Sequence, residues 1–207
     1  MNEIQKANKA LVDKYHWLLP RGYDDKVPED YDYSYTELDA MPEGWRIAFG
    51  LLMCEDIQKE LEKFYYADDF RVAQIKEKFG ELRFYHNGVP VGSRVSDIID
   101  DYAALSGYIC ISCGALDVPS TDGWIVPVCK ECICKMGQWA HDKDGAREYW
   151  EGLSKAQAPH MLPTKRGYIR FSKDKGTEKI EVDMSEIEKK VRDRARKRGI
   201  PMAQVRQ

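Results

Sequence analysis

The chain has 207 residues, of which 43% are hydrophobic and 32% charged, a composition typical of a soluble globular protein that buries a core. Its longest apolar run, IAFGLLMC, is too short to span a membrane, and its N-terminal residues are polar, so we expect neither a membrane span nor a signal peptide. Because its cysteines are also spaced for a metal rather than for disulfides, we expect a protein of the reducing cytoplasm.

The net charge of −3 conceals two halves of opposite sign. Residues 1–163 contain 18 Lys and Arg against 28 Asp and Glu, whereas residues 164–207 contain 14 against 7. This asymmetry predicts that the basic end binds something acidic and the acidic body something basic, or that the two ends bind each other.

The chain is predicted to begin with an amphipathic helix over 3–19 that stops at Pro20. Its apolar face consists of Ile4, Leu11, Tyr15 and Leu18. A loop follows in which eight acidic residues and one Lys lie between Asp24 and Glu43. One interpretation is a solvated loop whose tyrosines pack on the body. The other is an acidic, aromatic surface that binds a basic groove of a partner. This surface is formed by Tyr31, Asp32, Tyr33 and Tyr35.

Residues 43–66 are predicted to form a core helix after Pro42. Its apolar positions are Trp45, Phe49, Leu52, Ile57, Leu61 and Phe64. The segments FRVAQI and LRFYHNG then predict a β-hairpin around the turn KEKFGE. After it, SRVSDIIDDYAALSG predicts a helix that is capped by Ser93 or Ser96 and ends at Gly107 in the left-handed conformation.

Two C-x-x-C pairs follow, Cys110 with Cys113 and Cys129 with Cys132, and fifteen residues separate them. Two such turns can hold one Zn²⁺ ion from opposite sides, so the spacing predicts a structural zinc site. Free thiols, disulfides and a redox-active dithiol are the alternatives. Cys134 could replace Cys132 as the fourth ligand, although Cys132 has the better spacing.

Between the two pairs, turn residues and an apolar strand over 124–128 predict a β-hairpin whose two ends are joined by the zinc ion. Residues 135–153 are predicted to be partly helical, with Trp139, Tyr149 and Trp150 packed against this ribbon. A proline-containing linker near 155–165 then leads to a second hairpin, GYIRFS and TEKIEV. The chain is predicted to end in a basic helix that opens with a capping box at Ser185.

The sequence therefore predicts an α+β fold with helices packed on short antiparallel hairpins, an inserted four-cysteine zinc ribbon and a C-terminal β-hairpin plus basic helix. Three regions are expected. They are a body with the acidic Tyr-rich loop over 1–107, the zinc ribbon and its following helix over 108–154, and the C-terminal hairpin and helix over 164–207.

The run VAQIKEKFGELRFY, an amphipathic helix, CISCG and GWIVPVCKEC together resemble small uncharacterised proteins carried by bacteriophages and prophages. In these proteins a segment such as QIKEKFGGLRFY precedes a helix and a four-cysteine ribbon. Glu81 replaces the second glycine here, and the resemblance covers about residues 42–134. It implies a phage or mobile-element origin and a zinc-bearing cytoplasmic fold, but no activity.

The sequence shows no motif of a known enzyme class. We therefore expect a non-enzymatic protein that binds a host protein or nucleoprotein and inhibits a defence nuclease, like an anti-CRISPR protein. An alternative is a nucleic-acid-binding regulator, and an enzyme of another kind is a second alternative. Because the ribbon is not basic, binding to DNA or RNA is expected to use the C-terminal arm. The arm's cations are Lys189, Lys190, Arg192, Arg194, Arg196, Lys197 and Arg198.

Overall fold

The computed structural model describes residues 1–65, 67–116, 118–156, 162–164, 167–172 and 176–180. The chain forms two compact units, Met1–His160 and Met161–Gln207. Residues 108–154 thus belong to the same unit as residues 1–107. The predicted basic helix with its capping box lies outside the described residues.

The first helix, α1 (Glu3–Lys14), is shorter than the predicted one. It begins with a capping box in which Asn2 and Gln5 exchange hydrogen bonds. Tyr15 then leaves the helical conformation, and the short 3₁₀ helix η1 (His16–Leu18) buries Trp17 and Leu18. The prediction that Ile4 belongs to the buried face is wrong, because its side chain is exposed. The core contact of this segment comes mainly from the residues after the helix.

The predicted core helix is built from three helical pieces after the 3₁₀ helix η2 (Glu37–Ala40). These are α2 (Glu43–Trp45), a π-helical turn η3 (Arg46–Gly50) and α3 (Leu51–Leu61). The largest buried apolar side chains recur every four positions: Trp45, Phe49, Met53, Ile57 and Leu61. Such spacing drifts around an ideal α-helix, and the wider π turn offsets part of the drift. The predicted register is corrected accordingly, because Met53 rather than Leu52 is buried and the helix ends before Phe64.

A two-stranded antiparallel sheet follows the short 3₁₀ helix η4 (Ala67–Asp69). Its strands are β1 (Arg71–Lys78) and β2 (Glu81–Asn87), with Ile75 opposite Phe84. The predicted turn KEKFGE is too wide, because only Phe79 and Gly80 connect the strands. Both have positive φ, 55° and 76°, as the tight type I′ hairpin turn requires.

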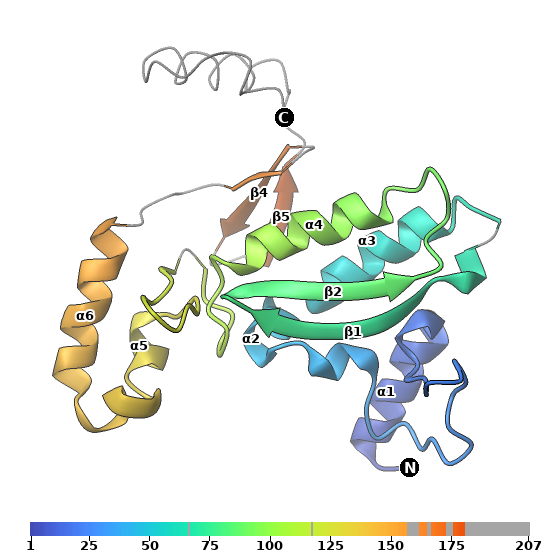
Figure 1. Cartoon of the computed structure of the whole chain (residues 1–207), viewed down its shortest axis with the longest axis horizontal. Helices are drawn as coiled ribbons and strands as arrows, with labels where there is room; N and C mark the ends of the chain where they lie inside the picture. The colour runs from blue at the N-terminus through green and yellow to red at the C-terminus, as the bar shows by residue number, and fades with distance from the viewer. Residues whose placement is uncertain (66, 117, 157–161, 165–166, 173–175, 181–207) are drawn as a thin grey trace. The chain divides into compact units, whose positions relative to one another are not determined.

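The helix α4 (Val95–Ser106) buries one apolar face, which consists of Val95, Ile98, Ile99, Tyr102 and Leu105. Its predicted ends are wrong. Arg94 occupies the N-cap position without a side-chain cap, and Gly107 is right-handed helical at φ −63°. Helices α3 and α4 lie together along one side of the hairpin, and α4 contacts β2 (Figure 1).

Aromatic rings fill the interior of this unit. Trp17 packs edge-on against Phe70 at 5.4 Å between ring centroids, and Phe49 stacks on Tyr102 at 5.4 Å. Strand β1 contacts η1 and η2, and the Trp17 ring of η1 lies 6.5 Å from the ring of the buried Phe84 in β2. The core therefore lies between the hairpin and the helical segments that flank it.

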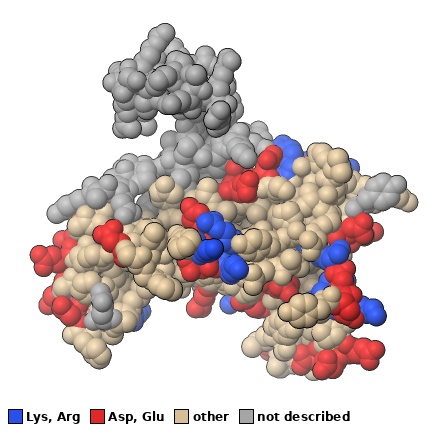
Figure 2. Space-filling model, in the orientation of Figure 1, with Lys and Arg blue, Asp and Glu red and all other residues tan. Residues whose placement is uncertain are grey.

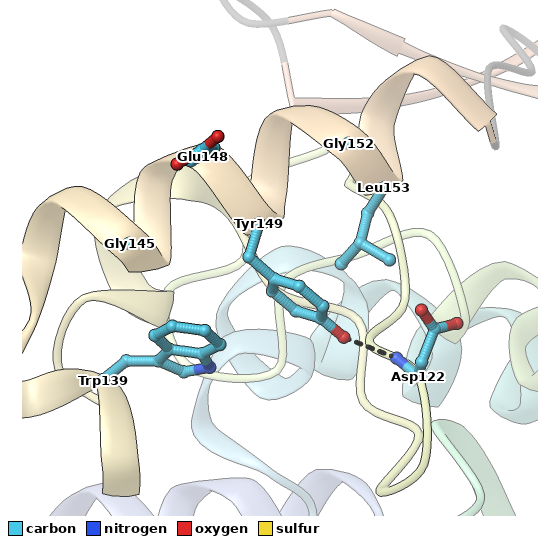
Figure 3. A pocket seen from close by; sticks show the side chains of 7 residues that line it. All are labelled: Asp122, Trp139, Gly145, Glu148, Tyr149, Gly152 and Leu153. Carbon is cyan, nitrogen blue, oxygen red and sulfur yellow. Dashed lines mark hydrogen bonds between the residues drawn. The ribbon is translucent and has the colours of Figure 1, made fainter.

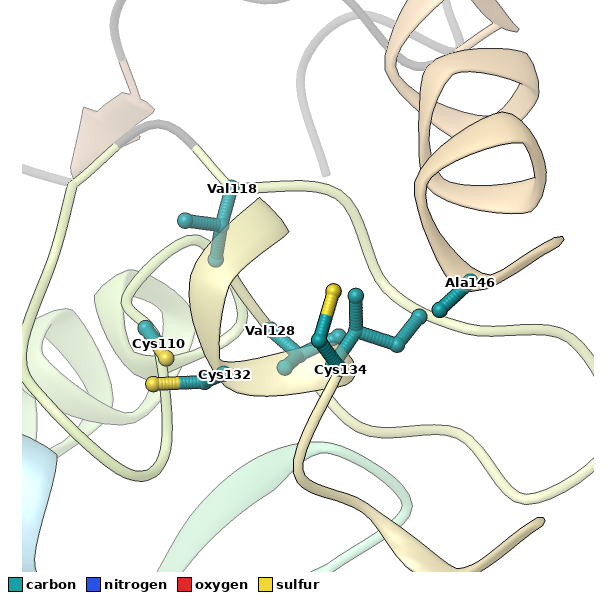
Figure 4. Packing of buried hydrophobic residues seen from close by; sticks show 7 residues of the cluster. Cys110, Val118, Val128, Cys132, Cys134 and Ala146 are labelled. Carbon is teal, nitrogen blue, oxygen red and sulfur yellow. The ribbon is translucent and has the colours of Figure 1, made fainter. Parts of the chain in front are cut away.

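The cysteine region contains bridges rather than the predicted strand. Two isolated β-bridges join Ile109 to Leu116 and Ser120 to Pro127, and residues 124–128 form no strand. The short helix α5 (Lys130–Ile133), the 3₁₀ helix η5 (Gly137–His141) and α6 (Lys143–Ala156) follow. Buried side chains from the two cysteine pairs, the loop between them and the helices form one cluster (Figure 4): Cys110, Val118, Val128, Cys132, Ile133, Cys134 and Ala146. Trp139, Tyr149 and Trp150 pack against it, as predicted.

In the second unit, β3 (Leu162–Thr164), β4 (Gly167–Ser172) and β5 (Gly176–Ile180) form an antiparallel sheet in that order. Ile169 of β4 lies opposite Leu162 on one side and Lys179 on the other. Strand β3 therefore begins within the segment predicted to be a linker. Across the described part of the chain, no helix combines the length and apolar character needed to cross a membrane.

Candidate metal centre

The structure brings the four predicted ligands together at one point. The Sγ atoms of Cys110, Cys113, Cys129 and Cys132 all lie within 4.8 Å of one another. Four thiolates around Zn²⁺, each at about 2.3 Å, are about 3.8 Å apart in a tetrahedron. The Cys113 and Cys129 sulfurs, 3.6 Å apart, match that spacing and are far longer than the roughly 2 Å of a disulfide. The group therefore has the geometry of a four-cysteine metal site.

The first pair lies on a turn closed by backbone hydrogen bonds. The Cys110 amide donates to the Ala115 carbonyl at 2.7 Å, and the Gly114 amide donates to the Cys110 carbonyl at 2.9 Å. Gly114 has φ +76°, a conformation that glycine adopts without strain. This turn directs both sulfurs of the C-I-S-C segment to the same side.

The second pair lies at the start of α5. Cys129 is the N-cap residue, and its Sγ accepts a hydrogen bond from the Cys132 amide at 3.4 Å. The Ile133 amide then donates to the Cys129 carbonyl at 3.0 Å. An amide that points at a sulfur stabilises the thiolate form that a metal requires.

The first cysteine turn is held on the body by the start of α2. The Gly44 amide donates to the Ile111 carbonyl at 2.9 Å, and the Trp45 indole Nε1 donates to the Ile109 carbonyl at 2.9 Å. A Cβ atom on Gly44 would lie 2.1 Å from the Cys110 carbonyl oxygen. Sequence reasoning missed this contact, because a Gly-Trp pair at a helix start does not show which distant segment it approaches.

The thiols differ in how readily they ionise. Burial raises the pKa of Cys110, but hydrogen bonds from the backbone amides of Cys129, Cys113 and Ser112 outweigh it, so the net shift is downward. Burial raises the pKa of Cys113 and, more strongly, that of Cys132. A divalent metal would supply the positive charge that four neighbouring thiolates need.

The remaining cysteines lie outside the metal group. The Cys134 Sγ is directed to backbone carbonyls of Lys130, at 3.3 Å, and Lys143, at 3.7 Å, within the apolar cluster (Figure 4). Cys54 is buried in α3, where burial raises the pKa of its thiol to about 12. The geometry therefore favours Cys132 over Cys134 as the fourth ligand, and four sulfurs leave no tetrahedral position for a substrate.

The Tyr-rich segment is an ordered cluster on α1. The Tyr31 ring lies 5.0 Å from Tyr33 and 5.9 Å from Tyr35, and the Tyr31 hydroxyl donates to the Tyr35 carbonyl at 2.6 Å. Burial raises the pKa of that hydroxyl to about 12.

Side chains of α1 attach this cluster to the body. Gln5 donates to the Asp32 carboxylate at 3.1 Å, and Asn8 donates to the Tyr33 carbonyl at 3.0 Å. Asp32 remains exposed, and Tyr35 keeps 49% of its surface exposed. The two interpretations of this segment therefore both retain support, since some tyrosine surface is packed and some is accessible.

A shallow pocket of about 540 Å³ is lined by residues of η5, α6 and the loop around Asp122 (Figure 3). Its walls are Asp122, Trp139, Gly145, Glu148, Tyr149, Gly152 and Leu153. Trp139 and Tyr149 stack with ring centroids 5.2 Å apart, and the Tyr149 hydroxyl accepts a hydrogen bond from the Asp122 amide at 2.9 Å. The stack attaches η5 to α6, and the hydrogen bond attaches the loop around Asp122 to α6.

The proposed nucleic-acid-binding arm, residues 189–198, lies outside the described residues. Comparison of the chain with protein-family models found no match, and comparisons with curated proteins and with solved structures found none either.

Proposed function

We propose that the four cysteines hold one structural Zn²⁺ ion. The support is the set of four sulfurs that all lie within 4.8 Å of one another, because zinc is the usual metal of four-thiolate sites. Bound to Cys110, Cys113, Cys129 and Cys132, zinc would join the turn after α4 to the start of α5. Its role in this proposal is to stabilise the fold, because no coordination position remains for chemistry.

We further propose that the chain is a non-enzymatic binding protein of phage or mobile-element origin that acts on a host protein or nucleoprotein in the bacterial cytoplasm. A cytoplasmic setting suits a site that needs reduced thiolates. The specific form we favour is inhibition of a defence nuclease, in the manner of an anti-CRISPR protein. The phage origin rests on the sequence resemblance alone.

The observation that carries this proposal is the preformed acidic tyrosine cluster. Tyr31 is held by two ring contacts and a hydrogen bond, while Asp32 and Tyr35 face solvent beside it. Tyrosines that are already ordered lose little conformational entropy on binding, so they are effective interface anchors. The surrounding carboxylates would complement a basic groove, such as one that normally holds nucleic acid.

The test compares capture of host proteins by the immobilised full-length chain and by the double variant D32N/Y35A. These two side chains are exposed. Their replacement removes the Tyr35 ring contact but leaves Tyr31 in contact with Tyr33 and hydrogen-bonded to the backbone carbonyl of residue 35. Tyr23→Ala is the matched control, because Tyr23 is fully exposed but lies before the cluster. Any captured nuclease is then purified, and both its affinity for the chain and its cleavage of DNA are measured.

We expect the wild type and Tyr23→Ala to bind the nuclease with equal affinity and to inhibit cleavage. D32N/Y35A should bind at least tenfold more weakly, which corresponds to about 1.4 kcal/mol. Nucleic acid that occupies the nuclease groove should displace the chain. Equal binding by all three proteins, or no displacement by nucleic acid, would contradict this surface and this mode of inhibition.

A further inference from the structure

The outward side of the β1–β2 hairpin carries an unusual set of side chains. Successive residues of a strand point to opposite faces, and the inward face buries Ile75, Leu82 and Phe84. The outward face and its turn, which we call the hairpin face, consist of Gln74, Lys76, Lys78, Phe79, Glu81, Arg83 and Tyr85. Three of these residues are positively charged and one is negatively charged, so the hairpin face has a net positive charge. Residues 1–163 as a whole have a net negative charge. Figure 2 shows basic side chains gathered over the turn end of the hairpin.

Phe79 occupies a position that is unfavourable for the fold. Its φ is +55°, a left-handed conformation in which a side chain with a Cβ is strained and which Asn or Gly adopts more readily. Its ring is 67% exposed, so burial does not offset the strain. An exposed aromatic residue that is kept in a strained turn is a reason to look for a binding role.

A second unfavourable feature lies on the same face. Lys76 and Arg83 are directly opposite each other in the strand register, and like charges in this relation destabilise a sheet. Each side chain turns to a neighbour on its own strand. The Lys76 Nζ donates to the Gln74 amide oxygen at 2.7 Å, and Arg83 pairs with Glu81 at 2.7 Å.

Aromatic rings accompany these cations. The Nζ of Lys78 lies 5.3 Å from the centroid of the Phe79 ring, and that of Lys76 lies 5.1 Å from the centroid of Tyr85. Tyr85 keeps 46% of its surface exposed. A nucleotide whose base stacked on either ring would therefore have a cation within reach of its phosphate.

The loop before the second cysteine pair extends this surface. Gly80 of the turn lies so close to Ile125 that a Cβ on it would be 3.0 Å from the Ile125 Cγ2 atom. The next residue towards the N-terminus, Trp124, is 81% exposed. The hairpin turn and this loop thus present Phe79, Ile125 and Trp124 on adjoining parts of the surface.

We propose that the hairpin face binds single-stranded nucleic acid, with phosphates at Lys76, Lys78 and Arg83 and bases stacked on Phe79 and Tyr85. Flat exposed rings beside cations suit unpaired bases, whereas paired bases in a duplex do not offer their faces. This site is distinct from the C-terminal arm and from the tyrosine cluster. The net negative charge of the body opposes it weakly, because charges more than about 8 Å away are screened at physiological ionic strength.

The test uses the full-length chain with fluorescent oligothymidylate, oligouridylate and a DNA duplex, and follows anisotropy between about 50 and 200 mM salt. Two variants remove the ring: Phe79→Asn, which suits the left-handed turn, and Phe79→Ala, which keeps the strain. Lys78→Glu reverses one charge of the face. Lys135→Glu is its matched control, because Lys135 is exposed but lies after α5.

We expect both Phe79 variants to bind oligothymidylate or oligouridylate at least fivefold more weakly, since one base stack is worth this much or more. Lys78→Glu should weaken binding and reduce the salt dependence, whereas Lys135→Glu should match the wild type. Phe79→Asn remains informative, because it should fold at least as well as the wild type.

Three results would overturn the proposal. The first is absence of binding by the wild type, and the second is equal binding by all variants, which would assign the affinity to the arm. The third is binding of a duplex, or of a polyglutamate peptide in place of the oligonucleotides, with the same sensitivity to the Phe79 and Lys78 substitutions. The duplex would exclude stacking on unpaired bases, and the peptide would assign the face to an acidic protein.

Discussion

Gly44 and Cys110 are in such close contact that a Cβ atom on Gly44 would lie 2.1 Å from the Cys110 carbonyl oxygen. The same Cβ would lie 2.7 Å from the Gly114 amide nitrogen. The obstacles are backbone atoms of the first cysteine turn, which cannot rotate away as a side chain can. The start of α2 and the metal centre are therefore positioned by each other.

Gly44→Ala should lower the free energy of unfolding by about 2 kcal/mol or more, because the added methyl group forces the cysteine turn away from α2. It should also weaken metal binding, since Cys110 moves with the turn. Urea unfolding and metal titration measure the two effects. Gly152→Ala is the control, because no atom lies within 4 Å of its added Cβ in α6, and there alanine should be neutral or stabilising. Equal stability of the two variants would contradict the close contact.

Replacement of single cysteines should separate ligands from core residues. Cys132→Ser should lose the bound metal and, with it, a cooperative unfolding transition, because zinc binding contributes directly to folding. Cys134→Ala should keep one equivalent of metal, since its sulfur faces the carbonyls of Lys130 and Lys143. Metal content of the purified variants and protection of thiols from a chromogenic reagent provide the measurement. If Cys134→Ala alone loses the metal, the assignment of the fourth ligand is wrong.

Glu60 should make stability depend on pH. Burial raises the pKa of this carboxyl, but hydrogen bonds from Lys63 and the Arg94 amide outweigh it, so the net shift is downward. A lowered pKa in the folded state means that the stabilisation is complete above the unfolded-state pKa and is lost as the pH falls through the folded value.

Glu60→Gln should therefore lower stability by about 1 to 2 kcal/mol at neutral pH and by progressively less in acid. Thermal unfolding across the acidic range measures the difference. Glu62→Gln, at an exposed position just after α3, should follow the wild type throughout. A Glu60→Gln deficit that stays constant with pH would show that the carboxylate charge is not responsible.

Phe79→Asn should raise the free energy of unfolding by about 1 kcal/mol, because asparagine tolerates the left-handed conformation better than phenylalanine. Phe79→Ala should give no such gain, since alanine retains the Cβ strain. Denaturant unfolding of the two variants provides the comparison. If both variants are less stable than the wild type, the ring stabilises the fold and its exposed position needs no functional explanation.

Several local features were predictable from sequence because short-range geometry determines them. Ile98, Ile99, Tyr102 and Leu105 repeat with the period of a helix, and these residues are buried. Alternating strands around Gly80 predicted the hairpin. The turn width was wrong, because a phenylalanine in a left-handed turn position is uncommon and composition alone does not indicate it.

Features that depend on the approach of distant segments were not predictable. The apolar residues of 43–66 indicated a helix, but the π turn at Arg46–Gly50, which determines whether Leu52 or Met53 is buried, was not apparent. The strand expected over 124–128 does not form. This segment contacts an isolated β-bridge partner, the backbone of the first cysteine turn and the β1–β2 hairpin turn, and it has no continuous strand partner.

The spacing of Cys110, Cys113, Cys129 and Cys132 was enough to predict two turns that each supply two thiolates, because two residues between thiolates is a local constraint on ligand geometry. Where those turns lie and what surrounds them depend on the tertiary structure. It placed Cys110 against Gly44 and Ile125 against Gly80, and left Phe79 in solvent. Such contacts join residues far apart in the chain, so they follow from the packing of whole elements and not from any local pattern.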